Sequence, residues 1–244
     1  MAHETGDVER EILVVIPLFH PFTTLDAIGP YEALHMIPRV TMQFVSTREG
    51  EAVTTDIGLL QLISIASFTN LPNPHIIVVR GRPRAFIVIN DTALIDWLKK
   101  AHITSTYTTS VCTGALAGLL EGLTATTHWE PYGNLAAYGA IPTETCMSFN
   151  GESRMSFLLQ CIVLGPTSRH GKIITSAGIS SGIDMALHLI TLLKGEEVAK
   201  MVKLLIEYDP QPPYDVGAPS KAGEELVEKT RQFSEYFINT LPAN

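Results

Sequence analysis

Short, fully apolar runs recur along the chain and are separated by segments with helical spacing. Every residue of Ile12–Leu18 and of Ile76–Val79 is apolar, which is typical of strands buried on both faces of a sheet. Ile103–Val111 is rich in β-branched and aromatic residues, and Val40–Ser46 and Ile173–Ser176 are predicted as further strands. Because helices intervene between these strands, the pattern predicts an α/β fold with a mostly parallel sheet flanked by helices.

Helices are predicted from capping residues and from the spacing of apolar positions. They cover Thr24–Leu34, a segment from Asp91 or Thr92 to His102, Ile183–Leu193, Glu196–Tyr208 and Glu224–Ile238. In the first helix Thr24 can cap, Asp26 lies in the first turn, and Pro30 is tolerated only near that end. Prolines exclude helix and interior strand from Asp209–Asp215, so this segment is predicted to run extended over the surface.

Two shorter elements complete the pattern. Val53–Ile65 is predicted as a hairpin around Gly58, and Thr124–Trp129 as a short strand leading into Glu130–Tyr138. No internal repeat or low-complexity segment interrupts the alternation.

Cys112 occupies the turn between the predicted strand Ile103–Val111 and a predicted helix that begins near Gly114. Gly114 and Gly118 would let this helix pack close against the sheet. A side chain at such an elbow points out of the fold beside free backbone N–H groups, which favour an anion and therefore a thiolate. The alternative is that Cys112 is a buried small hydrophobe, as most free cysteines are. The strand-Cys-helix pattern alone leaves both open.

Four chemically distinctive residues follow the ends of predicted strands. They are Asp26, Gly81, Cys112 and Gly178. Ligand sites of open α/β sheets lie at the carboxyl ends of the strands, so we expect these residues to meet at one edge of the sheet.

Composition narrows the possible partners and compartments. The chain has 244 residues, with 17 basic and 25 acidic side chains and a net charge of −8. This negative charge argues against nucleic acid or an anionic membrane as partner. The apolar runs are too short to span a bilayer, and Met1–Arg10 resembles no secretory or transit signal. Cys112, Cys146 and Cys161 form no C-x-x-C pair, so neither a disulfide framework nor a zinc site is encoded. A reducing, cytoplasmic setting is expected.

Several ordered motifs are similar to those of the ThiJ/PfpI superfamily, which has the flavodoxin-like, class I glutamine-amidotransferase-like fold. The similarity extends from about Ile12 to Ala222 and is greatest to the isocyanide hydratase branch and its fungal relatives. The motifs are Leu25-Asp-Ala-Ile-Gly-Pro30, Thr109-Ser-Val-Cys-Thr-Gly114, Ala125-Thr-Thr-His-Trp129, Ile174-Thr-Ser-Ala-Gly-Ile179, Gly182-Ile-Asp-Met-Ala186 and Ile206-Glu-Tyr-Asp-Pro-Gln-Pro-Pro213.

The resemblance implies a cysteine-dependent hydratase that converts an isocyanide into an N-substituted formamide without metal or organic cofactor. Cys112 would be the nucleophile, Asp26 its carboxylate partner and proton donor, and Thr113 a residue that orients water or the substrate nitrogen. An ordinary thiol with a pKa of about 8.5 is mostly protonated at neutral pH, and a protonated Asp26 could donate a hydrogen bond to its sulfur. The alternative role for Asp26 is a helix-start carboxylate that stabilises the helix dipole.

Other residues are expected to line the pocket. Gly178 and Ile179 would do so through backbone and apolar contacts, and Gly81 and Arg82 would lie at its mouth. His128 is either a substrate-site residue or a hydrogen-bonded structural histidine. Asp184, at a helix start, is expected to be a cap. The resemblance also implies a homodimer, and exposed apolar elements near the first helix and the Pro-rich segment favour it.

Two other functions stay open. A glyoxalase-like enzyme of the same superfamily would add its cysteine to an aldehyde carbon, but that branch usually has His after the nucleophile and Glu as carboxylate, where this chain has Thr113 and Asp26. A non-catalytic module that senses a ligand or an oxidant is the third possibility. Such regulators append a DNA-binding domain, for which few residues follow Ala222.

The chain departs from the superfamily pattern in two places. Pro-Gly-Gly is usual after the strand Ile76–Val79, where this chain has Arg80-Gly-Arg82-Pro83. A left-handed backbone at Arg82 would cost about 1–2 kcal/mol, although its side chain can also simply point to solvent.

The second departure is the long connection 145–170 with its apolar run Ser156–Gly165. It is either a genuine insertion or a gene-model error, and a tryptic peptide spanning Met155–Arg169 would exclude the error. We therefore expect one domain over 1–244, with its core at about 11–222, a C-terminal helix over 223–244 and an atypical insertion at 145–170.

Overall fold

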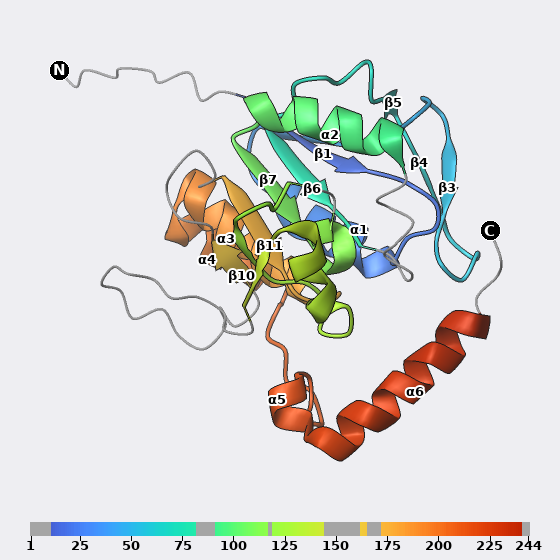
Figure 1. Ribbon diagram of the computed structural model, residues 1–244. Coiled ribbons are helices and arrows are strands. Elements are labelled where there is room, and N and C mark those ends of the chain that lie inside the picture. Colours follow the sequence, from blue (N-terminus) through green and yellow to red (C-terminus); the bar gives the residue numbers. More distant parts are fainter. Residues whose placement is uncertain (1–10, 82–90, 117–118, 144–161, 165–171, 241–244) are drawn as a thin grey trace.

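A single open sheet organises the molecule. The computed structural model describes residues 11–81, 91–116, 119–143, 162–164 and 172–240 (Figure 1). The sheet has seven strands in the order β10-β11-β7-β6-β1-β2-β5. Its strands are β1 (Ile12–Pro17), β2 (Val40–Ser46), β5 (Ala66–Ser67), β6 (Ile76–Val79), β7 (Tyr107–Ser110), β10 (Ile162–Leu164) and β11 (Ile173–Ser176). All neighbouring pairs are parallel except β10 and β11, which confirms the predicted mostly parallel sheet.

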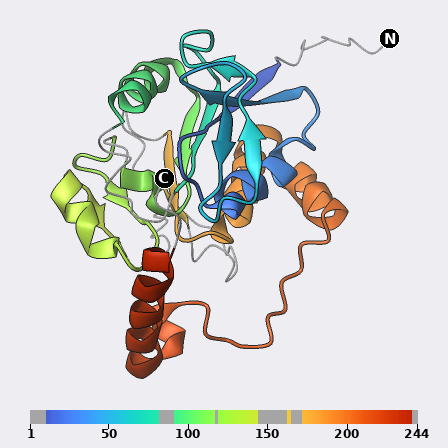
Figure 2. The same ribbon diagram turned by 90° about the vertical axis from the view of Figure 1, so that its right-hand side faces the viewer.

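Successive side chains of β1 point to opposite faces of this sheet, and each face has its own core. Val14 and Ile16 pack in a cluster with residues of α1 (Thr24–Leu34), α3 (Ser181–Lys194) and α4 (Glu196–Leu205). Val15 packs in a second cluster with residues of α2 (Thr92–Thr104). Figures 1 and 2 show α2 on one face and α1, α3 and α4 on the other. The double burial explains why the strands are apolar at every position.

The caps and turns of several predicted elements are confirmed. Asp91 Oδ1 accepts a hydrogen bond of 3.0 Å from the backbone N–H of Leu94 and so caps α2. The predicted hairpin consists of β3 (Ala52–Thr54) and β4 (Gln61–Ile63), and Gly58 in its turn has a φ of 77°. Gly195 separates α3 from α4, as predicted.

Three details differ from prediction. Residues 103 and 104, predicted as strand, belong to α2, because the helix continues past His102 and the strand starts at Tyr107. Thr23 rather than Thr24 occupies the cap position of α1, and its side chain makes no capping bond. Pro30 lies inside α1 rather than in its first turn. Its ring packs beside Gly182, where an added methyl group would lie 3.3 Å from Pro30 Cγ.

The helix predicted after Cys112 is instead a 3-10 helix, η2 (Cys112–Leu116), and Gly118 lies outside the described residues. The segment after the short strand β8 (Thr124–Ala125) is likewise a 3-10 helix, η3 (Tyr132–Tyr138). β8 pairs with β9 (Ile141–Pro142). With 5 and 7 residues, η2 and η3 are longer than most 3-10 helices.

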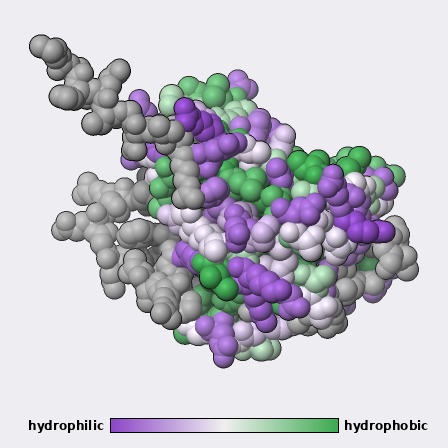
Figure 3. Space-filling view, turned by 90° about the horizontal axis from the view of Figure 1, so that it is seen from above, coloured by the Kyte–Doolittle hydropathy of each residue, from purple (hydrophilic) through white to green (hydrophobic). Residues whose placement is uncertain are grey.

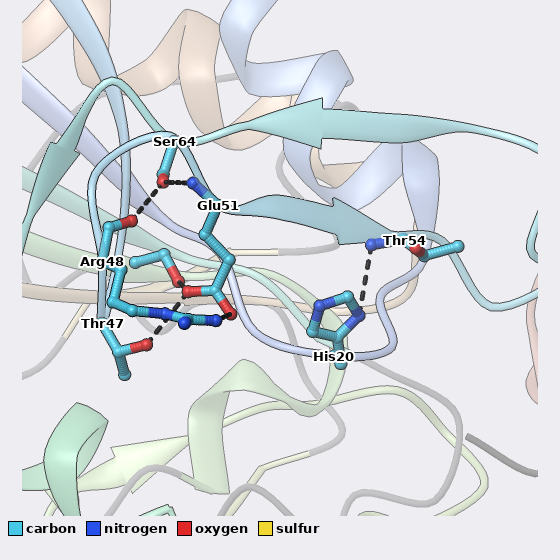
Figure 4. A network of polar contacts seen from close by, with 7 residues as sticks. His20, Thr47, Arg48, Glu51, Thr54 and Ser64 are labelled. Atoms are coloured by element: carbon cyan, nitrogen blue, oxygen red, sulfur yellow. Dashed lines mark hydrogen bonds and ion pairs between the residues drawn. The ribbon is translucent and has the colours of Figure 1, made fainter.

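A carboxylate network fastens the β3–β4 hairpin to the end of β2 (Figure 4). Glu51 accepts hydrogen bonds from the hydroxyl groups of Ser46 and Thr47, and its backbone N–H donates to Ser64 Oγ at 3.0 Å. Nearby, His20 Nδ1 accepts a hydrogen bond from the backbone N–H of Thr54 at 3.2 Å. The hairpin is therefore held both to β2 and to the loop that follows β1.

Most of the atypical connection lies outside the described residues, and so do Arg82, Cys146 and Cys161. The described part, β10, pairs antiparallel with β11, so Ile162 faces Ser176 and Leu164 faces Ile174. This segment, part of the apolar run Ser156–Gly165, thus supplies an edge strand.

The C-terminal segment projects from the body (Figure 1). It comprises α5 (Pro219–Ala222) and α6 (Glu224–Thr240), and α6 confirms the predicted terminal helix. Two contacts tie α6 to the body: the guanidinium carbon of Arg231 lies 5.2 Å from the ring centroid of Trp129, and Ser234 Oγ donates to Glu130 Oε2 at 3.0 Å.

Hydrophilic and hydrophobic residues are interspersed on the surface seen from above (Figure 3). Among the helices that the structure describes, none is both long enough and apolar enough to cross a membrane.

Candidate active site

Cys112 lies at the sharp turn between β7 and η2, as predicted. Its φ of 55° is in the left-handed region, which costs a non-glycine residue about 1–3 kcal/mol and persists where surrounding bonds impose it. Those bonds come from both sides: the Cys112 N–H donates to the carbonyl of Ala177 at 2.8 Å, and the Cys112 carbonyl accepts from Thr127 Oγ1 at 2.8 Å. The nucleophile candidate is therefore held rigidly by β11 and by the segment after β8.

Two glycines allow the backbone to close around this turn. A methyl group on Gly114 would lie 2.4 Å from the carbonyl oxygen of Val79, so only glycine fits there. A methyl group on Gly81 would lie 2.7 Å from Cys112 Cβ and from the Thr113 nitrogen. The end of β6 and the elbow are thus in direct contact.

Asp26 faces this turn from α1. The residue has an exposed fraction of 0%, and its Oδ2 accepts a hydrogen bond of 3.0 Å from the backbone N–H of Gly81. The carboxyl group also lies beside Cys112, since a methyl group on Gly81 would lie 2.8 Å from Asp26 Oδ2 and 2.7 Å from Cys112 Cβ. Among the described residues, Oδ1 has no N–H or O–H partner. Asp26 is therefore directed into the site rather than toward the free amides of its own helix.

The environment of Asp26 makes it a weak acid. Burial raises its pKa from 3.8 to about 7, against the opposing effects of the Gly81 N–H, the Arg80 guanidinium and the Cys112 thiol. The negative charge of Asp56 raises the pKa further. Asp26 can therefore both accept and release a proton near neutral pH.

The backbone N–H groups at the elbow favour a thiolate, as expected, but burial of Cys112 opposes them. Burial raises the pKa of the Cys112 thiol well above its ordinary value, and the charge of Asp26 raises it further. Backbone N–H groups of Thr113 and Ile179 at the sulfur lower the pKa, but desolvation is the larger effect because Cys112 has an exposed fraction of only 6%. A thiolate can form here when its proton passes to Asp26, so the two groups titrate as a pair.

Thr113 and Ile179 reach the site through their backbones. Both N–H groups lie at hydrogen-bonding positions to the Cys112 sulfur, and Ile179 adopts a φ of 27°. Thr113 is buried. The contribution of the Thr113 hydroxyl to substrate or water stays a prediction.

His128 lies against Gly178. A methyl group on Gly178 would lie 2.5 Å from His128 Cδ2, so the glycine makes room for the imidazole. Burial lowers the pKa of His128, which keeps the ring neutral at pH 7. His128 Nδ1 accepts a hydrogen bond of 3.3 Å from the Glu130 N–H, so the ring proton resides on Nε2.

Asp184, expected to be a cap, lies in the first turn of α3. It hydrogen-bonds Tyr208, and burial raises its pKa to about 6. This contact joins α3 to the chain that follows α4.

From the sequence, Arg80 stands out only because it replaces part of the usual Pro-Gly-Gly motif. The sequence does not show that this residue is buried beside the site. The residue is fully buried between the rings of Phe19 and Phe22, and its charge acts on Asp26. The available signal was a basic residue directly after a fully apolar strand.

No set of three His, Cys, Asp or Glu side chains that could bind a metal ion is found in the part of the chain that the structure describes. What the geometry provides is a buried thiol, a buried carboxyl group and two backbone amides at the sulfur. This arrangement suits nucleophilic addition coupled to proton transfer.

Comparison with known proteins identifies the class to which this fold and elbow belong. The family model "DJ-1/PfpI family" matches residues 12–192, and the chain belongs to this family. Among relatives, an isonitrile hydratase from Pseudomonas putida is 34% identical over 219 residues, which cover 88% of this chain and 86% of that protein.

Solved structures share the fold. The crystal structure of a ThiJ/PfpI family protein from Pseudomonas syringae has a TM-score of 0.79 and 24% identity, and the match covers 98% of this chain and 94% of that one. Oxidized DJ-1 from Toxoplasma gondii has a TM-score of 0.62 and 21% identity, covering 82% of this chain and 100% of its own.

Proposed function

We propose that this protein hydrates isocyanides to N-substituted formamides, with Cys112 as nucleophile and no metal or organic cofactor. The observation that carries the proposal is the buried Asp26–Cys112 pair: a methyl group on Gly81 would lie 2.7 Å from Cys112 Cβ and 2.8 Å from Asp26 Oδ2, so the two side chains meet beside this glycine. Burial also raises the pKa of Asp26 to about 7. The 34% identity to an isonitrile hydratase over most of both chains supports the same activity.

The pair carries one proton and one negative charge when the enzyme is ready to react. The thiol proton passes to Asp26, and the Cys112 sulfur then forms a bond to the terminal isocyanide carbon. Asp26 donates its proton to that carbon, where negative charge develops, and a thioimidate results. Burial favours this order of events because a buried acid with a pKa near the working pH transfers protons in both directions.

Water completes the reaction. The ionised Asp26 takes a proton from water as the water oxygen bonds to the thioimidate carbon, and Asp26 passes this proton to the substrate nitrogen. The carbon–sulfur bond then breaks, the product leaves as a formamide, and the thiol recovers its proton. One water molecule is consumed, and the pair returns to its initial state with one proton.

Residues around the sulfur would position the reacting atoms. The Thr113 hydroxyl is close enough in sequence to orient water or the substrate nitrogen. The protonated Nε2 of His128 provides a donor beside Gly178. We expect Gly81, Arg82, Gly178 and Ile179 to line the substrate pocket, and the substrate to be a small molecule.

The test is incubation of the purified protein with a small panel of isocyanides and with methylglyoxal. We expect formamide to accumulate from at least one isocyanide and no lactate to accumulate from methylglyoxal. Lactate formation without formamide would replace the proposal with a glyoxalase-like reaction, and absence of both products would favour a sensing module. Formamide formed equally by Cys112→Ser would remove the mechanism.

A further inference from the structure

Arg80 is a buried cation at the end of β6, next to the candidate active site. Its exposed fraction is 0%, and its guanidinium carbon lies 3.8 Å from the ring centroid of Phe19 and 4.3 Å from that of Phe22. Its Nη2 donates a hydrogen bond to the carbonyl of Phe19. The loop between β1 and α1 therefore wraps around the guanidinium, and the aromatic faces stabilise its charge.

The same loop leads into α1, which carries Asp26. Gly81, the residue after Arg80, donates its N–H to Asp26 Oδ2 at 3.0 Å. Arg80 is therefore the chain neighbour of the residue that holds the Asp26 carboxyl group. The charge of Arg80 lowers the pKa of Asp26 against the effect of burial. Burying a guanidinium is costly unless hydrogen bonds and opposite charge compensate, and Asp26 is an acidic group on which the Arg80 charge acts.

We propose that Arg80 is a positioning residue that holds the negative charge shared by Asp26 and Cys112 at neutral pH. The reaction requires the pair to have lost one proton, whichever of the two groups carries the remaining one. Both groups are buried, so without a nearby cation both would stay protonated to higher pH. The inference rests on the proposed function only for the role of the pair.

Other charged groups around Asp26 act differently. Asp56 opposes Arg80, and it is held near the site because its N–H donates to the carbonyl of Phe22 at 2.9 Å. On α3, which packs against α1, Asp184 interacts with Tyr208 and Lys203, and burial lowers the pKa of His188. Glu32, on α1 itself, is exposed. Among the charged side chains that act on the Asp26 carboxyl, Arg80 is the cation.

The experiment compares two variants that differ in charge. Arg80→Gln and Arg80→Lys both keep an N–H donor for the Phe19 carbonyl and both lose the planar guanidinium, but only the lysine variant keeps the positive charge. The readout is the rate of alkylation of Cys112 by iodoacetamide across pH, with the modified peptide identified by mass spectrometry. This readout needs no isocyanide, so it separates failure of this inference from failure of the proposed hydration.

In the wild-type protein and in Arg80→Lys, we expect the alkylation rate to rise with pH along a limb whose midpoint lies near pH 7. In Arg80→Gln it should move up by about one pH unit, the usual effect of removing a close opposite charge. Asp56→Asn should move it in the opposite direction. The same limb in Arg80→Gln and Arg80→Lys would overturn the inference. If neither variant folds, the wild-type profile decides: a limb above about pH 8.5, the value of an ordinary thiol, would contradict a charge held at neutral pH.

Discussion

At the scale of single residues, reactivity depends on a pair rather than on a cysteine. The Cys112 sulfur receives two backbone N–H groups, yet burial and the neighbouring carboxylate raise the thiol pKa. Desolvation of a fully buried charge outweighs a small number of hydrogen bonds. The same burial raises the pKa of Asp26 to about 7, so the carboxyl group can take the thiol proton.

Cys112→Ser should abolish isocyanide turnover and leave the fold intact, because a hydroxyl group fills the space of the thiol but is a far weaker nucleophile. Cys146→Ser and Cys161→Ser serve as matched controls and should keep full turnover. Formamide production measured for the three variants, with circular dichroism to verify folding, provides the test. Loss of turnover in either control would mean that Cys112 is not the sole essential cysteine.

Asp26→Asn removes the ionisable proton of the carboxyl group but preserves the volume of the side chain. Turnover should fall by about 10²–10⁴-fold, the usual contribution of general acid–base catalysis. A helix-start carboxylate would instead cost only up to about 1 kcal/mol of stability and leave turnover nearly unchanged. Turnover and the iodoacetamide rate at Cys112, followed across pH in both proteins, distinguish these roles. Turnover equal to that of the wild type would reduce Asp26 to a structural residue.

The same variant should change how stability depends on pH. Because the folded-state pKa of Asp26 is raised from 3.8 to about 7, the folded protein keeps a proton that the unfolded chain loses. Its contribution to the free energy of unfolding therefore falls as pH rises between these values, by up to about 4 kcal/mol. Asp26→Asn should lack this slope in urea unfolding curves measured from pH 4 to 8. A parallel pH dependence in both proteins would contradict the raised pKa.

At the scale of elements, the site is formed where four strand ends meet. β1, β6, β7 and β11 run parallel, and the segments that follow them supply Asp26, Gly81, Cys112 and Ile179. Close approach of the elements is possible because glycines replace side chains at their contacts.

Gly114→Ala should strongly destabilise the protein, because the new methyl group would lie 2.4 Å from the Val79 carbonyl oxygen, a backbone atom of a central strand. Gly133→Ala is the matched control, since nothing lies within 4 Å of its added methyl group. We expect a loss of roughly 1–3 kcal/mol for Gly114→Ala, typical of overpacking, and little change for the control. The measurement is the free energy of unfolding by denaturant. Equal stabilities would mean that η2 can move away from β6 without cost.

At the scale of the whole molecule, apolar side chains remain exposed on several elements. They include Leu59, Ile63, Leu204, Leu205 and Tyr214. An interface between two chains would bury such side chains.

We predict that the protein is a homodimer in solution. Light scattering at micromolar concentration should give twice the mass of 26.6 kDa expected for one chain. A monomeric mass would contradict the prediction.

The sequence by itself determined the layered architecture. Fully apolar strands such as Ile76–Val79 and helices such as Asp91–His102 arise from local spacing and capping, which any window of the chain displays. Parallel strands also bring their carboxyl ends to one edge, so the meeting of Asp26, Gly81, Cys112 and Gly178 could be predicted before any geometry was known.

Only the tertiary structure decided how these residues behave chemically. The desolvation of an ionisable group depends on all the atoms packed around it, and a local sequence pattern does not predict that packing. For this reason the sequence left open whether Cys112 is a thiolate or a buried thiol, and only the packing around it shows that burial raises its pKa. For the same reason the sequence did not reveal that Arg80 is buried between Phe19 and Phe22, where its charge reaches Asp26 from a residue 54 positions away along the chain.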